Sequence, residues 1–355
     1  MHATKIKSKS SSHIWKWSRI LGRGVAAAFG VFCVLLPFLS YIDNQFRRQR
    51  ELNESLEIAP LCSTLADLSQ MRLAYVFVHR YNRSSTTYLP RDIMLSTLDG
   101  KTSCHLTLDY AQEDNVVWSH DGSQLAYTIE GNVGNDQIAV FDLVSRETRK
   151  ITVQDTHRIR GMDWNSRSGE FAIQLIEGNG SYIADMEGHT IRYIDSELEL
   201  SLVGSPKWQP SGDNLLFEGY RSSEGLFNRI PVLFNLQTNT LRFIEIPITL
   251  DGLDHMIWLP NGEQFILVSY PSNRSTSIWI VNLDGSYEKL IDYDRQFDVQ
   301  QVTEDHLLLY HYDNQLHISS IFFYDLSRRL KLDALVELDF PVNLITPIPV
   351  VRPQQ

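Results

Sequence analysis

Three histidines near the C-terminal end of the chain could bind a metal ion. They are His306, His311 and His317, and imidazole is a frequent metal ligand. In a strand, side chains at odd spacing point to opposite faces, so His306 and His311 could not reach one ion without an intervening turn. We therefore expect no metal site at these histidines.

Three aspartates, Asp292, Asp294 and Asp298, lie close together in the segment DYDRQFD. Their carboxylates are the kind of oxygen ligand that calcium takes. The segment lacks the glycine and the terminal glutamate of the twelve-residue calcium loop. A solvated connector between strands is the expected structure here.

Motifs for nucleophilic, phosphate or dinucleotide chemistry are absent from the sequence. There is no G-x-S-x-G elbow, no P-loop, no H-E-x-x-H and no dinucleotide fingerprint. The glycine-rich run at 178–181, GNGS, is typical of a hairpin loop. We predict no catalytic residue, no cofactor and no metal ligand.

A tryptophan followed by a polar turn and an apolar strand recurs four times along the chain. The segments are WSHDGSQLAY, WNSRSGEFAI, WQPSGDNLLF and WLPNGEQFIL, beginning at Trp118, Trp164, Trp208 and Trp258. Glycine supplies the positive φ that tight turns need, as we expect for Gly122, Gly212 and Gly262. Each tryptophan comes at the end of a strand, where a large ring fills the space between packed sheets.

A second strand–turn–strand element follows each of these units and extends the repeat in both directions. Its copies begin near residues 93, 138, 182, 231, 278 and 321, which gives six units. The segments are rich in Val, Ile, Leu, Phe and Tyr and are bounded by Gly, Asn, Asp and Ser. A period of 40–50 residues with short strands predicts an all-β, six-bladed β-propeller with four-stranded blades.

The repeats resemble the six-bladed propeller of TolB and, more loosely, WD-type repeats. The residues that carry the resemblance lie in one blade: Trp118, Ser119, Asp121, Gly122, Leu125, Ala126, Tyr127, Ile138, Asp142 and Leu143. The resemblance covers about residues 58–335 and implies the fold. It also implies an interaction platform, whereas the extra N-terminal domain of TolB has no counterpart here. Some propeller hydrolases hold calcium in the central channel, which keeps a channel-bound metal open as an alternative.

An apolar segment precedes the repeats. Residues 1–24 hold six lysines and arginines and no acid, and Val25–Ile42 has no charge. Eighteen residues span about 27 Å as a helix, which is close to the thickness of the bilayer core. The positive-inside rule then predicts a single-pass anchor with a cytoplasmic N-terminus and an extracytoplasmic body. A cleaved signal peptide and a buried core helix are the alternatives.

The remaining segments complete the domain organisation. We expect a linker at 43–57 and the propeller at 58–355, with 58–70 as a candidate first strand of blade one. The tail at 336–352 has apolar runs and prolines. It is the candidate for ring closure, at the edge position to which proline is restricted.

Two cysteines and four sequons bear on the compartment. Cys62 and Cys104 could form a disulfide in an oxidising environment, or remain two separate buried thiols. In a eukaryotic secretory compartment, four N-x-S sequons would be glycan acceptors. They begin at Asn53, Asn82, Asn179 and Asn273.

The charge of the body limits the class of partner. Outside residues 1–24 the chain has 26 basic against 43 acidic residues, which argues against binding to nucleic acid. We expect a non-catalytic scaffold or accessory subunit of a membrane complex, with a protein partner. The longer connectors at 79–91 and 219–230 are the expected contacts. The alternative is a propeller-type hydrolase or lactonase with a metal in its channel.

Overall fold

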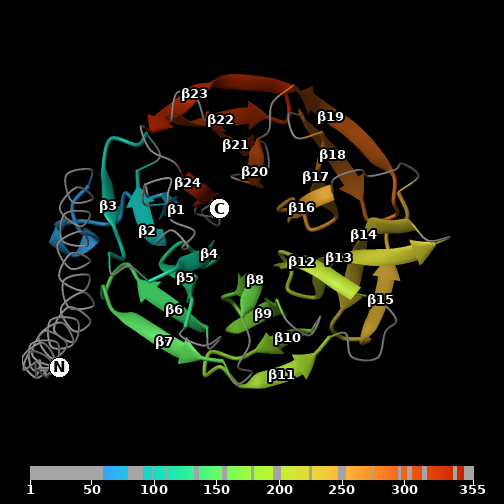
Figure 1. Cartoon of the computed structure of the whole chain (residues 1–355), viewed down its shortest axis with the longest axis horizontal. Coiled ribbons are helices and arrows are strands. Elements are labelled where there is room, and N and C mark those ends of the chain that lie inside the picture. The colour runs from blue at the N-terminus through green and yellow to red at the C-terminus, as the bar shows by residue number, and fades with distance from the viewer. Residues whose placement is uncertain are drawn as a thin grey trace, which may run out of the picture. The chain divides into compact units, whose positions relative to one another are not determined.

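A computed structural model gives the arrangement of the propeller (Figure 1). It describes residues 59–78, 91–97, 99–108, 111–131, 136–153, 158–176, 180–194, 201–223, 226–246, 253–272, 275–294, 297–301, 306–313, 318–338 and 342–347. The expected anchor at 25–42 and linker at 43–57 lie outside these residues. Within the part of the chain that the structure describes, no helix is long and apolar enough to span a bilayer.

Six four-stranded antiparallel sheets form the ring, which confirms the predicted six-bladed propeller. The strands within each blade pair in chain order from the centre outward, except in blade one. Blade one contains β24 (Val342–Pro347), β1 (Leu73–Val78), β2 (Arg91–Ser96) and β3 (Ser103–His105); blade two β4 (Glu113–Trp118), β5 (Gln124–Ile129), β6 (Gln137–Asp142) and β7 (Thr148–Thr152); blade three β8 (Ile159–Asn165), β9 (Glu170–Leu175), β10 (Ser181–Ala184) and β11 (Thr190–Tyr193); blade four β12 (Ser201–Trp208), β13 (Asn214–Ser223), β14 (Leu226–Asn235) and β15 (Thr240–Phe243); blade five β16 (Leu253–Trp258), β17 (Gln264–Ser272), β18 (Ser275–Asn282) and β19 (Tyr287–Tyr293); blade six β20 (Asp298–Gln301), β21 (His306–Asp313), β22 (Ile318–Asp325) and β23 (Leu330–Leu338).

The C-terminal strand closes the ring. β24 pairs antiparallel with β1, with Leu73 opposite Pro347 and Phe77 opposite Val342, and it forms the inner strand of blade one. The strand lies inside the proline-containing tail at 336–352, and it occupies an edge of its sheet. The candidate first strand at 58–70 is wrong for the described residues 59–70. They form a short 3-10 helix, η1 (Cys62–Thr64), and one bridge from Leu61 to His105, because β24 already occupies the inner edge.

The repeated tryptophans pack between neighbouring blades. Trp118 is buried against Ile93 and Leu95 of blade one, and Trp164 against Ile138 of blade two. Trp208 packs in the same way on Ala172 and Ile183 of blade three, and Trp258 on Leu216 and Leu233 of blade four. The Trp258 Nε1–H also donates to the Lys207 carbonyl at 3.0 Å. Each ring therefore belongs to the seam with the preceding blade.

The glycines of the repeated turns adopt positive φ. Gly122 has φ 69°, Gly212 85° and Gly262 69°, values that L side chains rarely adopt. The amide of each donates to the carbonyl three residues before it, at 2.8–2.9 Å. These turns join the inner strand to the second strand of blades two, four and five.

A disulfide fixes the start of the described chain to blade one. Cys62 and Cys104 are bonded, with their Cα atoms 4.8 Å apart, and both residues are buried. The His105 amide also donates to the Pro60 carbonyl at 2.8 Å. The segment around η1 is thus attached to β3, the outer strand of the blade.

Candidate functional site

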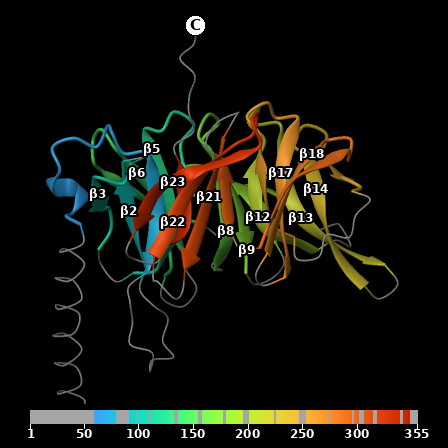
Figure 2. The same cartoon turned by 90° about the horizontal axis from the view of Figure 1, so that it is seen from above.

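The direction of the strands gives the ring two different faces. The loop face is defined here as the face on which the six inner strands begin, and the turn face as the one on which they end. The β5–β6, β9–β10 and β13–β14 loops lie on the loop face because each second strand runs back to it. Figure 2 shows the β13–β14 hairpin extending beyond the ring on one side.

Five of the six inner strands have a register irregularity near their start on the loop face. In blade three, Ile159 pairs with Leu175 and Gly161 with Gln174, so Arg160 is an extra residue. In blade two, Asn115 and Val116 lie opposite a single residue of β5. The pairings of β12, β16 and β24 shift in the same region. Bulges re-aim side chains and are frequent beside binding sites, so this rim is the candidate site.

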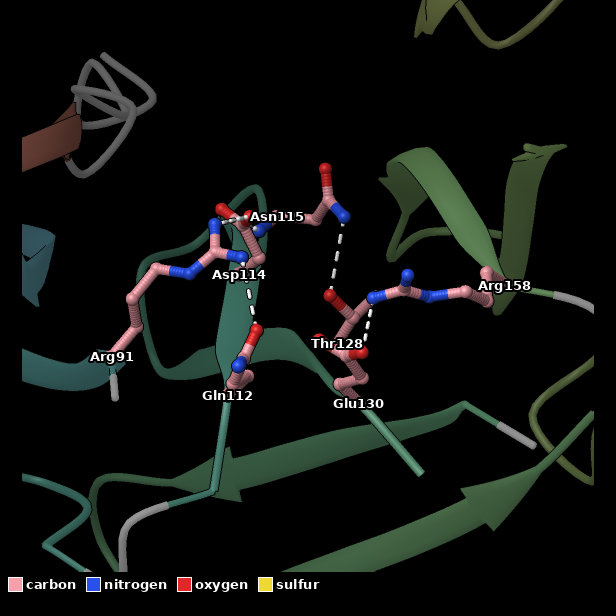
Figure 3. Close-up of polar contacts among 7 residues, drawn as sticks. All are labelled: Arg91, Gln112, Asp114, Asn115, Thr128, Glu130 and Arg158. Carbon is pink, nitrogen blue, oxygen red and sulfur yellow. Dashed lines mark hydrogen bonds and ion pairs between the residues drawn. The ribbon is translucent and has the colours of Figure 1, made fainter. Parts of the chain in front are cut away.

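An ion pair joins blades one and two at this rim (Figure 3). The Arg91 guanidinium, at the start of β2, contacts the Asp114 carboxylate in β4. Its other terminal nitrogen donates to Gln112 Oε1 at 3.4 Å, and Arg91 and Gln112 also form a backbone bridge. Both charged side chains retain partial exposure, so the pair is a surface feature of the rim.

A second group of contacts joins blades two and three. Arg158, just before β8, forms an ion pair with Glu130, just after β5. Within blade two, Asn115 Nδ2 of the inner strand β4 donates to Thr128 Oγ1 of β5 at 3.1 Å. Thr128 and Glu130 are two residues apart, so the two contacts lie about 7 Å apart along the chain.

Asn115 has an unusual backbone conformation. Its φ is 50°, in the left-handed region that non-glycine residues visit seldom and asparagine more than most. Left-handed residues other than glycine cluster at functional sites, where the surrounding structure holds them. Asn115 is therefore a candidate functional residue at the rim between blades two and three.

Hydrogen bonds from the preceding blade fix the starts of three inner strands. Asp136 Oδ2 accepts from the Ile159 amide at 2.7 Å, and Thr276 Oγ1 accepts from the Phe297 amide at 2.8 Å. Arg229 Nη1 donates to the Leu253 carbonyl at 2.6 Å. These hydrogen bonds cross the seams from blade two to three, from blade five to six and from blade four to five. They hold the starts of three inner strands, and with them the rim, in place.

The turn face has a small hollow between blades two and three. It encloses about 180 Å³ and is lined by Ser119, His120, Asp121, Ser123, Gln124, Ser166 and Arg167. Burial lowers the pKa of His120, with the Arg167 guanidinium as the second cause. Asp121 Oδ1 accepts from Ser119 Oγ at 2.7 Å and from the Ser123 amide at 3.0 Å. Its polar groups thus bond mainly to one another.

Those of the histidines and aspartates considered from sequence that the structure describes do not form a common metal site. His306 contacts the Phe323 ring edge-on and His311 lies against Phe297, while His317 lies outside the described residues. Asp292 accepts from Ser277 Oγ and Lys289 Nζ, and Asp298 accepts from Tyr270 Oη. Among the residues that the structure describes, no group of three His, Cys, Asp or Glu side chains could hold a metal ion.

The four sequons, at Asn53, Asn82, Asn179 and Asn273, all lie outside the described residues. The rim residues Asn115, Arg158 and Arg160 were not predicted. A signal for two of them exists in the repeat, since Asn115 and Arg160 are polar residues three and four positions before the repeated tryptophan of their blade.

Solved structures with the same fold include both binding proteins and enzymes. The chain is similar to TolB from Acinetobacter baumannii, with a TM-score of 0.59, 13% identity, and coverage of 79% of this chain and 67% of that one. A nidogen/laminin complex matches with a TM-score of 0.56, 14% identity, and 78% and 98% coverage. An oligogalacturonate lyase in complex with manganese matches with a TM-score of 0.50, 12% identity, and 76% and 75% coverage. No protein family and no curated protein matches the sequence. At these identities the comparisons show the fold, a six-bladed propeller with TolB-like structural neighbours.

Proposed function

We propose that this chain is a non-catalytic interaction module that binds a protein partner at its loop face, as a subunit of a membrane complex. The observation that carries the proposal is the β13–β14 hairpin. Its pairing runs without interruption from Asn214–Asn235 to Ser223–Leu226, ten residue pairs in all. Loops on a rigid scaffold commonly carry binding function, and this one is the longest described hairpin of the ring.

The outer part of this hairpin extends beyond the pairing of its described neighbours. β12 pairs with β13 up to Tyr220, and β15 pairs with β14 only from Val232 to Asn235. Residues 221–223 and 226–228 therefore extend past both partners within the described chain (Figure 2). A strand with an accessible edge can add a partner segment by backbone hydrogen bonding.

Solved structures with the same fold also support protein binding. One structure with this fold was solved as a nidogen/laminin complex, so the fold occurs in an assembly of two proteins. At the rim described above, charged side chains connect one blade to the next. Together with the hydrogen bonds across the seams, they hold the starts of the inner strands in place for docking.

We further propose that residues 25–42 anchor the chain in a membrane, with the propeller outside the cytoplasm. The uncharged run and the basic residues before it support this topology. The Cys62–Cys104 disulfide adds independent support, because such bonds persist mainly in oxidising compartments. Protease treatment of sealed, right-side-out cells or vesicles should cleave the propeller only if it faces outward.

The test is affinity purification of the full chain from detergent-solubilised membranes. The variant replaces residues 221–228 with Asn-Gly, which closes a two-residue turn between Tyr220 and Arg229, a pair that faces across the hairpin. Tyr220, Arg229 and Glu218 stay, so the bond from Arg229 to Leu253 is retained. The matched control is Val144→Asp, at an exposed position on the turn face.

We expect a stoichiometric protein partner with the wild type and with V144D, and its loss with the shortened hairpin at an unchanged unfolding midpoint. Retention of every partner by the shortened hairpin would remove the hairpin from the interface. A stoichiometric metal ion in the purified wild-type chain, with no partner, would contradict the whole proposal and favour the metal-dependent enzyme.

A further inference from the structure

Side chains on the turn face link the turn of one blade to the turn of the next. The turns meant here join the inner strand to the second strand, at 119–123, 165–169, 209–213 and 259–263 in blades two to five. The His120 amide donates to Ser166 Oγ at 2.8 Å, from blade two to blade three. Gln209 Nε2 donates to the Gly262 carbonyl at 2.6 Å, from blade four to blade five. These links keep neighbouring turns in fixed positions.

Arg167 connects the turns of three successive blades. It lies in the turn of blade three, and its Nη2 contacts His120 Nε2 in the turn of blade two. Its Nη1 donates to the Pro210 carbonyl in the turn of blade four at 3.3 Å. The position of the guanidinium therefore depends on the His120 imidazole on one side and on a backbone carbonyl on the other.

The contact between Arg167 and His120 requires a neutral imidazole. A guanidinium has N–H donors and no acceptor, so His120 Nε2 must supply the lone pair and the imidazole proton must lie on Nδ1. A proton on Nε2 would remove the acceptor and place two cations side by side. This hydrogen bond therefore exists in only one of the two charge states of His120.

A partner for the protonated imidazole lies in the same turn. Asp121 follows His120 and lines the same hollow. Its carboxylate favours a positive charge on His120, whereas the Arg167 guanidinium opposes one. Among the residues that the structure describes, these two charged groups act on the imidazole, one from its own turn and one from the turn of blade three. The imidazole thus has a different partner for each of its charge states.

From this geometry we infer that His120 is a pH-sensitive switch between blades two and three. The neutral imidazole joins the two turns through Arg167. The protonated imidazole releases Arg167 and turns toward Asp121, so the turn of blade three loosens from blade two, and its guanidinium is no longer positioned at the Pro210 carbonyl. The inference concerns the turn face and is independent of the proposed partner at the loop face.

The direction of the pH response follows from the environment of the imidazole. Burial lowers the pKa of His120 from its ordinary value of 6.5, with the Arg167 guanidinium as the second cause. Because the folded pKa lies below the unfolded one, the contact contributes fully above the unfolded value and is lost as pH falls through the folded pKa. Asp121 remains ionised in this range, since the Ser123 amide and the Ser119 hydroxyl lower its pKa.

The test is hydrogen exchange of the full chain in detergent micelles, measured at about pH 4.5 and about pH 7.5 and corrected for the rates of the unfolded chain. His120→Gln keeps an acceptor for Arg167 and does not titrate. His120→Lys carries a positive charge at both pH values. The matched control is His189→Gln, since His189 is an exposed histidine in the turn between β10 and β11 and contacts Asp185 there.

We expect the peptides that cover 119–124 and 165–169 to exchange roughly two- to tenfold faster in acid in the wild type and in H189Q, as the loss of one hydrogen bond implies. H120Q should stay protected at both pH values, and H120K should exchange fast at both. The turn at 259–263 contacts neither side chain and should not respond. A wild type without the acid response, an equal response in H120Q, or an H120K protected at neutral pH would each overturn the inference.

A second measurement remains decisive if H120K fails to fold. A double-mutant cycle with His120→Ala and Arg167→Ala gives the coupling free energy between the two side chains from unfolding curves. The switch requires a favourable coupling at neutral pH that disappears or becomes repulsive in acid. A coupling that is the same at both pH values would contradict it.

Discussion

The seam between blades three and four depends on the absence of a side chain at Gly161. A Cβ built at this position in β8 would lie 2.2 Å from Ser205 Oγ, 2.7 Å from Ser205 Cα and 2.8 Å from Ser205 Cβ. The hydroxyl could rotate away, but the Cα belongs to the backbone of β12. Gly161→Ala therefore forces one inner strand away from its neighbour.

The cost follows from overpacking in a seam that is already filled. Inserting one methyl group where the backbone must move costs about 1–3 kcal/mol. For a domain of this size, that lowers the unfolding midpoint by roughly 2–10 °C. Gly180→Ala is the matched control, since a Cβ there has no atom within 4 Å. It should be neutral or slightly stabilising, by about 0.4–1 kcal/mol, through the unfolded state.

The assay is thermal and denaturant unfolding of the purified chain, followed by tryptophan fluorescence. The double variant Gly161→Ala with Ser205→Gly removes the Ser205 side chain and should recover part of the loss, since residues in contact couple energetically. Equal midpoints for G161A and G180A would refute the close approach of β8 and β12. So would full additivity in the double variant.

The other predictions concern ring closure, the disulfide and the Asp163 carboxyl. Deleting residues 342–355 removes β24 and should lower the unfolding midpoint at least as far as G161A does. Deleting only 348–355 is the control, and equal midpoints for the two truncations would contradict closure by β24. Replacing Cys62 and Cys104 by serine should lower the free energy of unfolding by about 2–4 kcal/mol, and a wild-type midpoint indifferent to reductant would argue against the bond. Burial raises the pKa of Asp163, opposed by Lys207 and by the Trp208 amide that its Oδ2 accepts from at 2.7 Å. Because the folded pKa lies above the unfolded one, stability is lost as pH rises between the two values, and Asp163→Asn should remove that slope in a pH series of denaturation curves. A slope unchanged in D163N would assign it to other groups.

The fold could be predicted because its determinants repeat along the chain. Trp118 and Gly122 have counterparts in three other blades, and each pair marks an inner strand and its turn. The strand–turn–strand element that follows occurs six times, and it fixes the blade number without knowledge of any long-range contact. The inner strand of blade one, β24, is different, because its partner β1 lies more than 250 residues away in sequence. From the sequence, both the tail at 336–352 and residues 58–70 were candidates for a strand of blade one. The tail supplies β24, whereas the described residues 59–70 form no strand.

The candidate site was less predictable because it depends on register. Arg160 becomes a bulged residue only through the pairing of β8 with β9, and one residue of slippage would place another side chain at the rim. Asn115 has a left-handed backbone for a reason that its neighbours in sequence do not reveal. Asp114 and Arg91 come together across a blade boundary, 23 residues apart. Sequence periodicity indicates which residues form strands, but it does not give the register in which the strands pair.

The most direct test of the interaction account is photocrosslinking in native membranes. A photoreactive amino acid replaces Ile176 on the loop face or, in a second variant, Val144 on the turn face, which are both exposed apolar residues at 48% and 86%. The account predicts one protein adduct from position 176, lost when residues 221–228 are replaced by Asn-Gly, and no such adduct from position 144. Adducts from both positions alike, or none from position 176 in membranes where the chain is intact, would contradict it.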